Sequence, residues 1–294
     1  MIFSKYYINP KLSFHSNLDN KIERGSIYDR NGILLARTIE SYSLFTNPQK
    51  IKNPDILSKK LEKILSIPKN KILSELNNKS KKRIWIKRNI SPQEHIKIIN
   101  LGEVLLQTEI ESKRVYPMQE TTSHVVGFTD VDGKGLSGIE KGLQNELSMG
   151  QNIYLSIDAR IQHSVRNELI KTIEKFNANS GTSIVMDIKS GEIISMVNYP
   201  DFNPNIRNIL LTQNQFNNAT QGIFEMGSTF KPITMAIGLD KNIIDEKMLF
   251  DVSRPLYISG YTINDFTPYD GKLDVKGIIV NSSNIGTAKI AKKI

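Results

Sequence analysis

Hydrophobic and polar positions in the first third of the chain alternate in a way that predicts a small antiparallel sheet. Residues 24–36 read RGSIYDRNGILLA, and Asn31 and Gly32 stand between two apolar runs. Both residue types accept the positive φ of a tight hairpin turn, so we expect paired strands on either side of them. The alternation over residues 41–47 continues this sheet, and residues 83–90 predict a further strand.

Two amphipathic helices are predicted beside these strands. One begins after Asn53, with a proline at its first position, and its apolar residues recur at helical spacing: Leu57, Leu61, Ile64 and Leu65. The other begins at residues 91–94 (SPQE), a capping box with proline at the first helical position, and runs through Ile96 and Ile99 to Leu101. Strands and helices together indicate an α+β module.

A change in composition around residues 149–151 marks the domain boundary that we expect, which gives domains of residues 1–150 and 151–294. After this boundary, residues 153–158 predict a strand, and residues 160–176 predict a long amphipathic helix.

A second hairpin is predicted from residues 182–188 and 192–198, with Lys189, Ser190 and Gly191 as its turn. Glycine supplies the positive φ that such a turn needs. This KSG tripeptide also fits the K-[ST]-G pattern of serine acyl-transfer enzymes, but it lies in a turn and precedes the serine discussed below. We therefore interpret it as a hairpin loop.

Charge is concentrated in one part of the chain. The whole chain carries +9, whereas residues 50–100 alone contain fourteen Lys or Arg against four acidic residues, a local net charge of +10. Such a surface suits anionic lipid head groups or another acidic surface. The simpler explanation of this positive charge is that the lysines and arginines lie on solvent-exposed helix faces. A nucleic-acid site would need aromatic residues interleaved with these basic residues. Residues 50–100 contain only one, Trp85, so we expect no nucleic-acid partner.

Composition excludes several kinds of site. The 294 residues are 39% hydrophobic and contain no cysteine, which excludes disulfides, thiolate catalysis and thiolate metal sites. The four histidines are scattered, without an i,i+4 pair: His15, His95, His124 and His163. We expect neither a metal nor a cofactor. No apolar run reaches about 18 residues, and the N-terminal residues do not have the pattern of a signal peptide, so neither a transmembrane anchor nor an export signal is visible.

Candidate chemistry centres on residues 227–232 (GSTFKP). Ser228 and Lys231 lie three apart at a predicted helix start, on one face, so that the lysine amine can reach the serine hydroxyl. The apolar residues that follow predict a buried helix. This spacing of serine and lysine, S-x-x-K, recurs at Ser66 and Lys69. A proline stands between those two residues and no apolar helix follows them, so we assign no catalytic role there. Taken alone, Ser228 has the simpler interpretation of a helix N-cap.

A second motif lies downstream, at residues 281–286 (NSSNIG). Ser282 and Asn284 form an S-x-N triad that occurs once in the chain. S-x-x-K, an S-x-N-type triad and K-T-G mark penicillin-binding proteins and class A β-lactamases. The chain contains the first two in this order.

Longer segments resemble one family more closely. Residues 224–232 (FEMGSTFKP) resemble the nucleophile segment of high-molecular-weight penicillin-binding proteins. Residues 24–30, 114–117 and 138–140 resemble the three boxes of the class B non-catalytic pedestal, a dimerisation-type domain. Residues 282–286 are more similar to the cell-division (FtsI) type. The resemblance implies an α+β chain: an elongated pedestal, then an incomplete serine transpeptidase domain of β-lactamase-like fold.

This resemblance also implies a function, a peptidoglycan D,D-transpeptidase of cell division. Ser228 would attack a stem peptide and form an acyl-enzyme, with Lys231 as base, Ser282 as proton relay and Asn284 binding the substrate amide. β-Lactams would be covalent inhibitors. Division membrane proteins would be partners, and the site would face the periplasm at the inner membrane.

The K-T-G strand does not follow Ser282, which leads us to expect a truncated or split polypeptide. The alternative function is a non-catalytic scaffold fragment that docks division partners. A β-lactam sensor or hydrolase is a third class, and the pedestal boxes argue against it.

Overall fold

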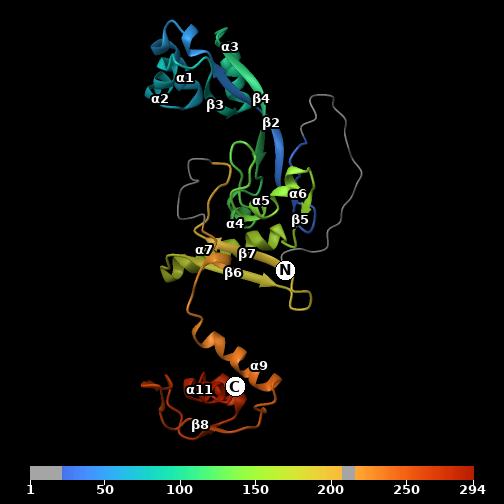
Figure 1. Cartoon of the computed structure of the whole chain (residues 1–294), viewed down its shortest axis with the longest axis vertical. Helices are drawn as coiled ribbons and strands as arrows, with labels where there is room; N and C mark the ends of the chain where they lie inside the picture. The colour runs from blue at the N-terminus through green and yellow to red at the C-terminus, as the bar shows by residue number, and fades with distance from the viewer. Residues whose placement is uncertain (1–21, 207–215) are drawn as a thin grey trace. The chain divides into compact units, whose positions relative to one another are not determined.

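The computed structural model describes residues 22–206 and 216–294 (Figure 1). The chain divides into two compact units, Met1–Gly222 and Ile223–Ile294. These units are defined by their internal packing. The boundary expected between residues 150 and 151 concerns family domains and stays a prediction.

A five-stranded sheet organises the first part of unit 1. Its strands lie in the order β3-β2-β1-β5, and β4 also pairs with β2. β2 runs antiparallel to β4 from Arg37 opposite Val115 to Thr46 opposite Leu106. The strands are β1 (Ile27–Tyr28), β2 (Leu34–Thr46), β3 (Ile84–Ile90), β4 (Leu106–Val115) and β5 (Ile153–Tyr154).

Three helices pack near one end of β2, as Figure 1 shows: α1 (Pro54–Leu65), α2 (Lys69–Asn77) and α3 (Pro92–Asn100). Leu61 and Leu76 are fully buried there with Leu44 of β2. The short 3₁₀ helix η1 (Pro48–Lys50) connects β2 to this cluster. Burial of these apolar side chains removes them from water and holds the helices on the strands.

The predicted elements of this region are confirmed. Asn31 and Gly32 connect β1 to β2, and Gly32 has a φ of +80°. At α3, the Ser91 hydroxyl accepts a bond from the Glu94 backbone, and the Glu94 carboxylate accepts one from the Ser91 backbone. The α3 stripe differs from the expectation, because Ile96 and Ile99 are exposed and Ile98 is buried.

The sequence pattern did not predict α2 or β4, two of the elements that pack beside β2 and β3. α2 follows a proline in a lysine-rich stretch, where only Ile72 and Leu76 are buried. β4 carries polar or charged residues at seven of its ten positions and is held by its ladder with β2 rather than by apolar burial. Sequence periodicity is weak in both segments, and packing and backbone pairing decide their structure.

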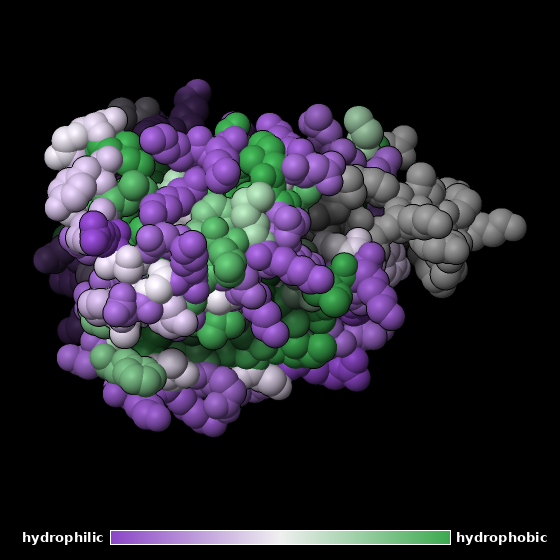
Figure 2. Space-filling model, turned by 90° about the horizontal axis from the view of Figure 1, so that it is seen from below, coloured by the Kyte–Doolittle hydropathy of each residue, from purple (hydrophilic) through white to green (hydrophobic). Residues whose placement is uncertain are grey.

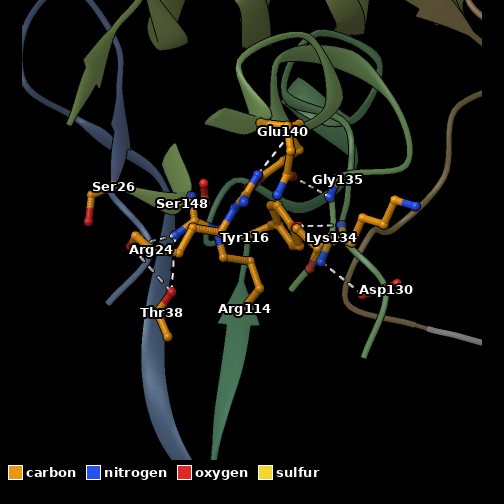
Figure 3. Close-up of polar contacts among 12 residues, drawn as sticks. Arg24, Ser26, Thr38, Arg114, Tyr116, Asp130, Lys134, Gly135, Glu140 and Ser148 are labelled. Atoms are coloured by element: carbon orange, nitrogen blue, oxygen red, sulfur yellow. Dashed lines mark hydrogen bonds and ion pairs between the residues drawn. The ribbon is translucent and has the colours of Figure 1, made fainter. Parts of the chain in front are cut away.

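The three pedestal boxes meet at one buried carboxylate, that of Glu140 (Figure 3). Arg24 Nε and Arg114 Nε each donate to it at 2.8 Å, and Arg24 also donates to the Glu140 carbonyl. Arg114 further contacts the Arg24 carbonyl and the Thr38 hydroxyl. The boxes at residues 24–30, 114–117 and 138–140 therefore form one structural junction.

Gly138 in the third box is required by space as well as by backbone conformation. Its φ is +55°, and an added Cβ would lie 2.6 Å from the Gly127 backbone nitrogen. Larger residues cannot occupy this position without moving the chain. Short helices surround the junction: η2 (Gln119–Thr122), α4 (Ser123–Val126), α5 (Gly138–Gly142) and α6 (Gln144–Ser148).

The remainder of unit 1 contains α7 (Ala159–Phe176), a hairpin of β6 (Gly181–Met186) and β7 (Ile193–Tyr199), and α8 (Asn218–Gln221). The helix and the hairpin agree with the predictions. The strand predicted over residues 153–158 is shorter in the structure, where β5 covers only Ile153–Tyr154. The residues that follow leave β1 and reach β7. Leu155 N donates to Tyr28 O in β1, and Asp158 N donates to Ile194 O in β7. Asp158 then caps α7.

Unit 2 has its own apolar core, in which Ile278 and Ile290 are fully buried. Its helices are η5 (Gly227–Phe230), α9 (Lys231–Asp240), α10 (Val275–Val280) and α11 (Asn284–Ala291). Its strands form two small antiparallel pairs, β8 (Phe250–Asp251) with β11 (Lys272–Leu273) and β9 (Leu256–Ile258) with β10 (Tyr261–Ile263).

The expectation that α9 is a buried helix is wrong. Met235 and Gly238 are buried, but Ile233 and Ile237 are 48% and 41% exposed. The core of unit 2 packs against only one face of α9. Figure 2 shows the molecule from below, where apolar residues in green reach the surface between hydrophilic residues in purple.

Candidate active site

Ser228 and Lys231 lie on consecutive elements at the predicted helix start. Ser228 is in the 3₁₀ turn η5, and Lys231 is the first residue of α9, with Pro232 directly after it. Gly227 begins the turn with a φ of +55°. Side chains three apart eclipse each other on a 3₁₀ turn, so the two residues share a face. Ser228 is exposed, whereas Lys231 is buried.

The lysine amine is bonded to the second motif. Lys231 Nζ donates to Ser282 Oγ at 3.0 Å and also to the Ser282 carbonyl oxygen. Among the described residues, the Ser228 hydroxyl has no hydrogen bond, so the expected contact between Ser228 and Lys231 is not formed here. The structure thus brings Lys231 and Ser282 together, with Ser228 one turn before the amine.

Burial changes the acidity of this amine. It lowers the pKa of Lys231 below its ordinary value of 10.5, and the negative charge of Asp265 acts in the opposite direction. The position at the start of α9 also disfavours a positive charge, because the N-terminus of a helix carries partial positive charge. A lysine with a lowered pKa is more readily neutral, as a proton acceptor must be.

Ser282 lies in the turn that joins α10 to α11, and Asn284 is the first residue of α11. Ser282 adopts a left-handed φ of 50°. Ser283 is the N-cap of α11, and its hydroxyl accepts a bond from Gly286 N at 2.9 Å. Asn284 begins the helix, and its side-chain amide donates to the Asn264 carbonyl at 2.8 Å.

Asp265 is the residue of this site that the sequence did not reveal. Its carboxylate accepts a bond from Ser283 Oγ at 2.7 Å and one from Ile285 N at 2.9 Å. It lies in a loop, about twenty residues before the turn that it contacts. No spacing rule connects such a loop carboxylate to the S-x-N motif, so only the folded structure shows the relationship.

The two other motif copies lie in ordinary structural positions. Ser66 is the left-handed C-cap of α1, and the Lys69 amine pairs with Asp55. Lys189, Ser190 and Gly191 form the turn between β6 and β7, where Asp187 accepts bonds from the backbones of Lys189 and Ser190. This hairpin confirms the structural interpretation of the KSG tripeptide.

Two family models match the chain. The penicillin-binding protein dimerisation domain matches residues 19–186, and the penicillin-binding protein transpeptidase domain matches residues 181–294. The chain is 32% identical over 277 residues to the probable peptidoglycan D,D-transpeptidase FtsI of Caulobacter vibrioides, with 92% of this chain and 47% of that protein covered.

Two further relatives are also named as peptidoglycan D,D-transpeptidases. The peptidoglycan D,D-transpeptidase FtsI of Escherichia coli strain K12 is 30% identical over 302 residues, covering 91% of this chain and 51% of that protein. The probable peptidoglycan D,D-transpeptidase PenA of Neisseria gonorrhoeae is 32% identical over 305 residues, covering 92% and 52%. The chain spans about half the length of these curated relatives.

A solved structure, that of a peptidoglycan synthetase from Bifidobacterium adolescentis, shares the fold. Its TM-score is 0.66 at 21% identity, and the match covers 93% of this chain and 60% of that one. In residues 22–206 and 216–294, no helix combines the length and apolar character needed to cross a lipid bilayer. The family models and the relatives confirm the resemblance: the chain belongs to the penicillin-binding proteins of the FtsI and PenA kind, with a dimerisation domain followed by a transpeptidase domain.

Proposed function

We propose that this chain carries the nucleophile region of a peptidoglycan D,D-transpeptidase that acts in cell division. The observation that carries the proposal is the buried Lys231 amine, bonded to Ser282 Oγ at 3.0 Å beside an exposed Ser228. This arrangement suits acyl transfer for three reasons. The serine is exposed to solvent, the pKa of the lysine is lowered, and a second hydroxyl, that of Ser282, is hydrogen-bonded to the lysine amine.

The first half of the reaction forms an acyl-enzyme. Ser228 Oγ attacks the carbonyl carbon of the penultimate D-alanine of a stem peptide, and its proton passes to the neutral amine of Lys231. The backbone N–H of Ser228 donates to the oxyanion; loss of one such donor costs about 10²–10³ in rate. When the peptide bond breaks, the proton returns through Ser282 to the leaving amine of the terminal D-alanine.

In the second half, an amine of a neighbouring stem peptide attacks the ester carbonyl and releases Ser228. This forms the peptide cross-link and restores the hydroxyl proton. Asn284 is the proposed contact for the substrate amide, because its side-chain carbonyl still has acceptor capacity while its amide group donates to Asn264. A β-lactam undergoes only the first half of this reaction. Ser228 Oγ attacks the lactam carbonyl, the ring opens, and the inhibitor stays bound to Ser228 as an ester.

Partners and location belong to the same proposal. A cross-linking enzyme meets its substrate on the periplasmic face of the inner membrane, and division membrane proteins are the proposed partners of the pedestal. The names of the FtsI and PenA relatives support the activity.

The test is turnover of a synthetic stem peptide that ends in D-alanyl-D-alanine, with the full-length protein and an acceptor amine. The proposal expects release of D-alanine together with a cross-linked product, and neither with Ser228→Ala. Release of D-alanine by Ser228→Ala at the wild-type rate contradicts it.

A scaffold role is the second candidate. The buried junction of Arg24, Arg114 and Glu140 favours it, because the pedestal is internally bonded without any contribution from Ser228. The two functions separate in cells that depend on this protein for division. A scaffold supports division with Ser228→Ala, whereas a transpeptidase does not.

A further inference from the structure

The loop segment after β10 contacts the start of α11 at three points. Asp265 Oδ2 accepts a bond from Ser283 Oγ at 2.7 Å, and Asp265 Oδ1 accepts one from Ile285 N at 2.9 Å. The Asn264 carbonyl accepts a bond from Asn284 Nδ2 at 2.8 Å. Three consecutive residues, Ser283, Asn284 and Ile285, are therefore bonded to two residues from a distant part of the sequence.

The turn that these contacts hold has an unusual conformation. Ser282 has a φ of 50°, in the left-handed region that residues with a Cβ adopt rarely for steric reasons. The end of α10 holds its other side, since Ser282 N donates to Ile279 O at 3.0 Å and Ser283 N donates to Ile278 O at 2.9 Å. In this conformation both oxygens of Ser282 meet the Lys231 amine.

We propose that Asp265 is a positioning residue of the Ser228 site: its two carboxylate oxygens fix the turn from which Ser282 contacts Lys231. The inference rests on the proposed function, because that function gives the Ser282–Lys231 contact its purpose. A carboxylate suits this place because both of its oxygens accept hydrogen bonds. Asparagine keeps one acceptor, and alanine keeps none.

The same carboxylate acts on the amine through its charge. Its negative charge opposes the effect of burial, so the pKa of Lys231 is lowered less than burial alone would lower it. Neutralising Asp265 therefore lowers the pKa of Lys231, so that the neutral amine is available at lower pH. This effect separates Asp265 from a residue that only stabilises the fold.

The test measures the second-order rate of acylation of the full-length protein by a fluorescent penicillin. Asp265→Ala removes both acceptors, and we expect a fall of about 100-fold, as for a small misplacement of catalytic groups. Asp265→Asn can accept from Ile285 N and donate to Ser283 Oγ, so we expect a fall of about tenfold or less.

Asp251→Asn is the matched control. Asp251 lies in the same unit and accepts bonds from Ser253, and its carboxylate does not contact the turn at residues 282–285. We expect its rate to stay within about twofold of the wild type. The pH midpoint of acylation should move to lower pH in Asp265→Asn and stay unchanged in Asp251→Asn. A wild-type rate for Asp265→Ala, or an unmoved midpoint for Asp265→Asn, overturns the inference.

Hydrogen exchange separates this inference from the proposed function. If penicillin does not acylate the wild type, the proposed function fails, and exchange of the Ile285 amide decides the role of Asp265. The inference expects this amide to exchange about fivefold or more faster in Asp265→Ala than in the wild type or Asp251→Asn. Equal exchange overturns it, whether or not the wild type is acylated.

Discussion

Lys231 Nζ lies 3.0 Å from Ser282 Oγ, a contact that joins residues 51 positions apart. It connects the first residue of α9 to the turn before α11, so both motifs of the proposed site meet within unit 2. The buried amine of Lys231 is thus hydrogen-bonded to Ser282. The hydroxyl of Ser228 is exposed and available to a substrate.

Lys231→Met tests the role of the amine. Methionine fills a similar volume and cannot accept a proton, so we expect acylation by penicillin to fall by about 10²–10⁴-fold, the usual contribution of a general base. Thermal unfolding of the variant shows whether it is folded. A folded variant that reacts as fast as the wild type contradicts the assignment of Lys231 as base.

The pH dependence of acylation follows from the lowered pKa of Lys231. Protonated amine cannot take the Ser228 proton, so the rate should rise with pH as the amine becomes neutral. Because burial lowers this pKa, the midpoint should lie below the ordinary lysine value of 10.5. Stopped-flow acylation rates across pH measure it. A midpoint at or above 10.5 is inconsistent with the buried environment of Lys231.

Ser282→Ala tests the proton relay. The substitution removes the hydroxyl and keeps the backbone carbonyl that also contacts Lys231, so the amine stays anchored while the path to the leaving group is lost. We expect release of D-alanine from a stem peptide to fall by about 10²-fold. Ser253→Ala, which removes a hydroxyl bonded to Asp251, is the control and should keep its activity. Equal rates for the two variants count against the relay.

Glu140→Gln tests the pedestal junction. Two arginines bond to this fully buried carboxylate, and removing its charge leaves them buried without a counter-ion. We expect a loss of about 3–5 kcal/mol in the free energy of unfolding. Denaturant unfolding measures it, with Glu109→Gln as the control, since Glu109 forms an exposed pair with Arg83 that should contribute about 1 kcal/mol or less. Equal losses in both variants contradict a structural role for the junction.

Local rules predicted the parts of the fold that depend on neighbouring residues. The hairpin at Asn31 and Gly32, the capping box at Ser91 and the β6–β7 turn at Gly191 each depend on residues within four positions. The three pedestal boxes were found through resemblance, and the structure adds that they meet at Glu140.

Long-range packing determined what local rules missed. β4 is a strand because β2 pairs with it, and the apolar stripe of α9 stays partly exposed because the core reaches one face. For the same reason Asp265 could not be found: its partners Ser283 and Ile285 lie 18 and 20 positions away. The motif residues Ser228, Lys231, Ser282 and Asn284 were found from the sequence, and their roles remain proposals.

Peptide mapping of the penicillin adduct tests the central proposal, that Ser228 is the nucleophile. The full-length protein is treated with penicillin, digested, and analysed by mass spectrometry alongside Ser228→Ala. The proposal predicts one adduct, on the peptide that contains Ser228, and none in the variant. An adduct on another residue, or an adduct that persists in Ser228→Ala, contradicts it.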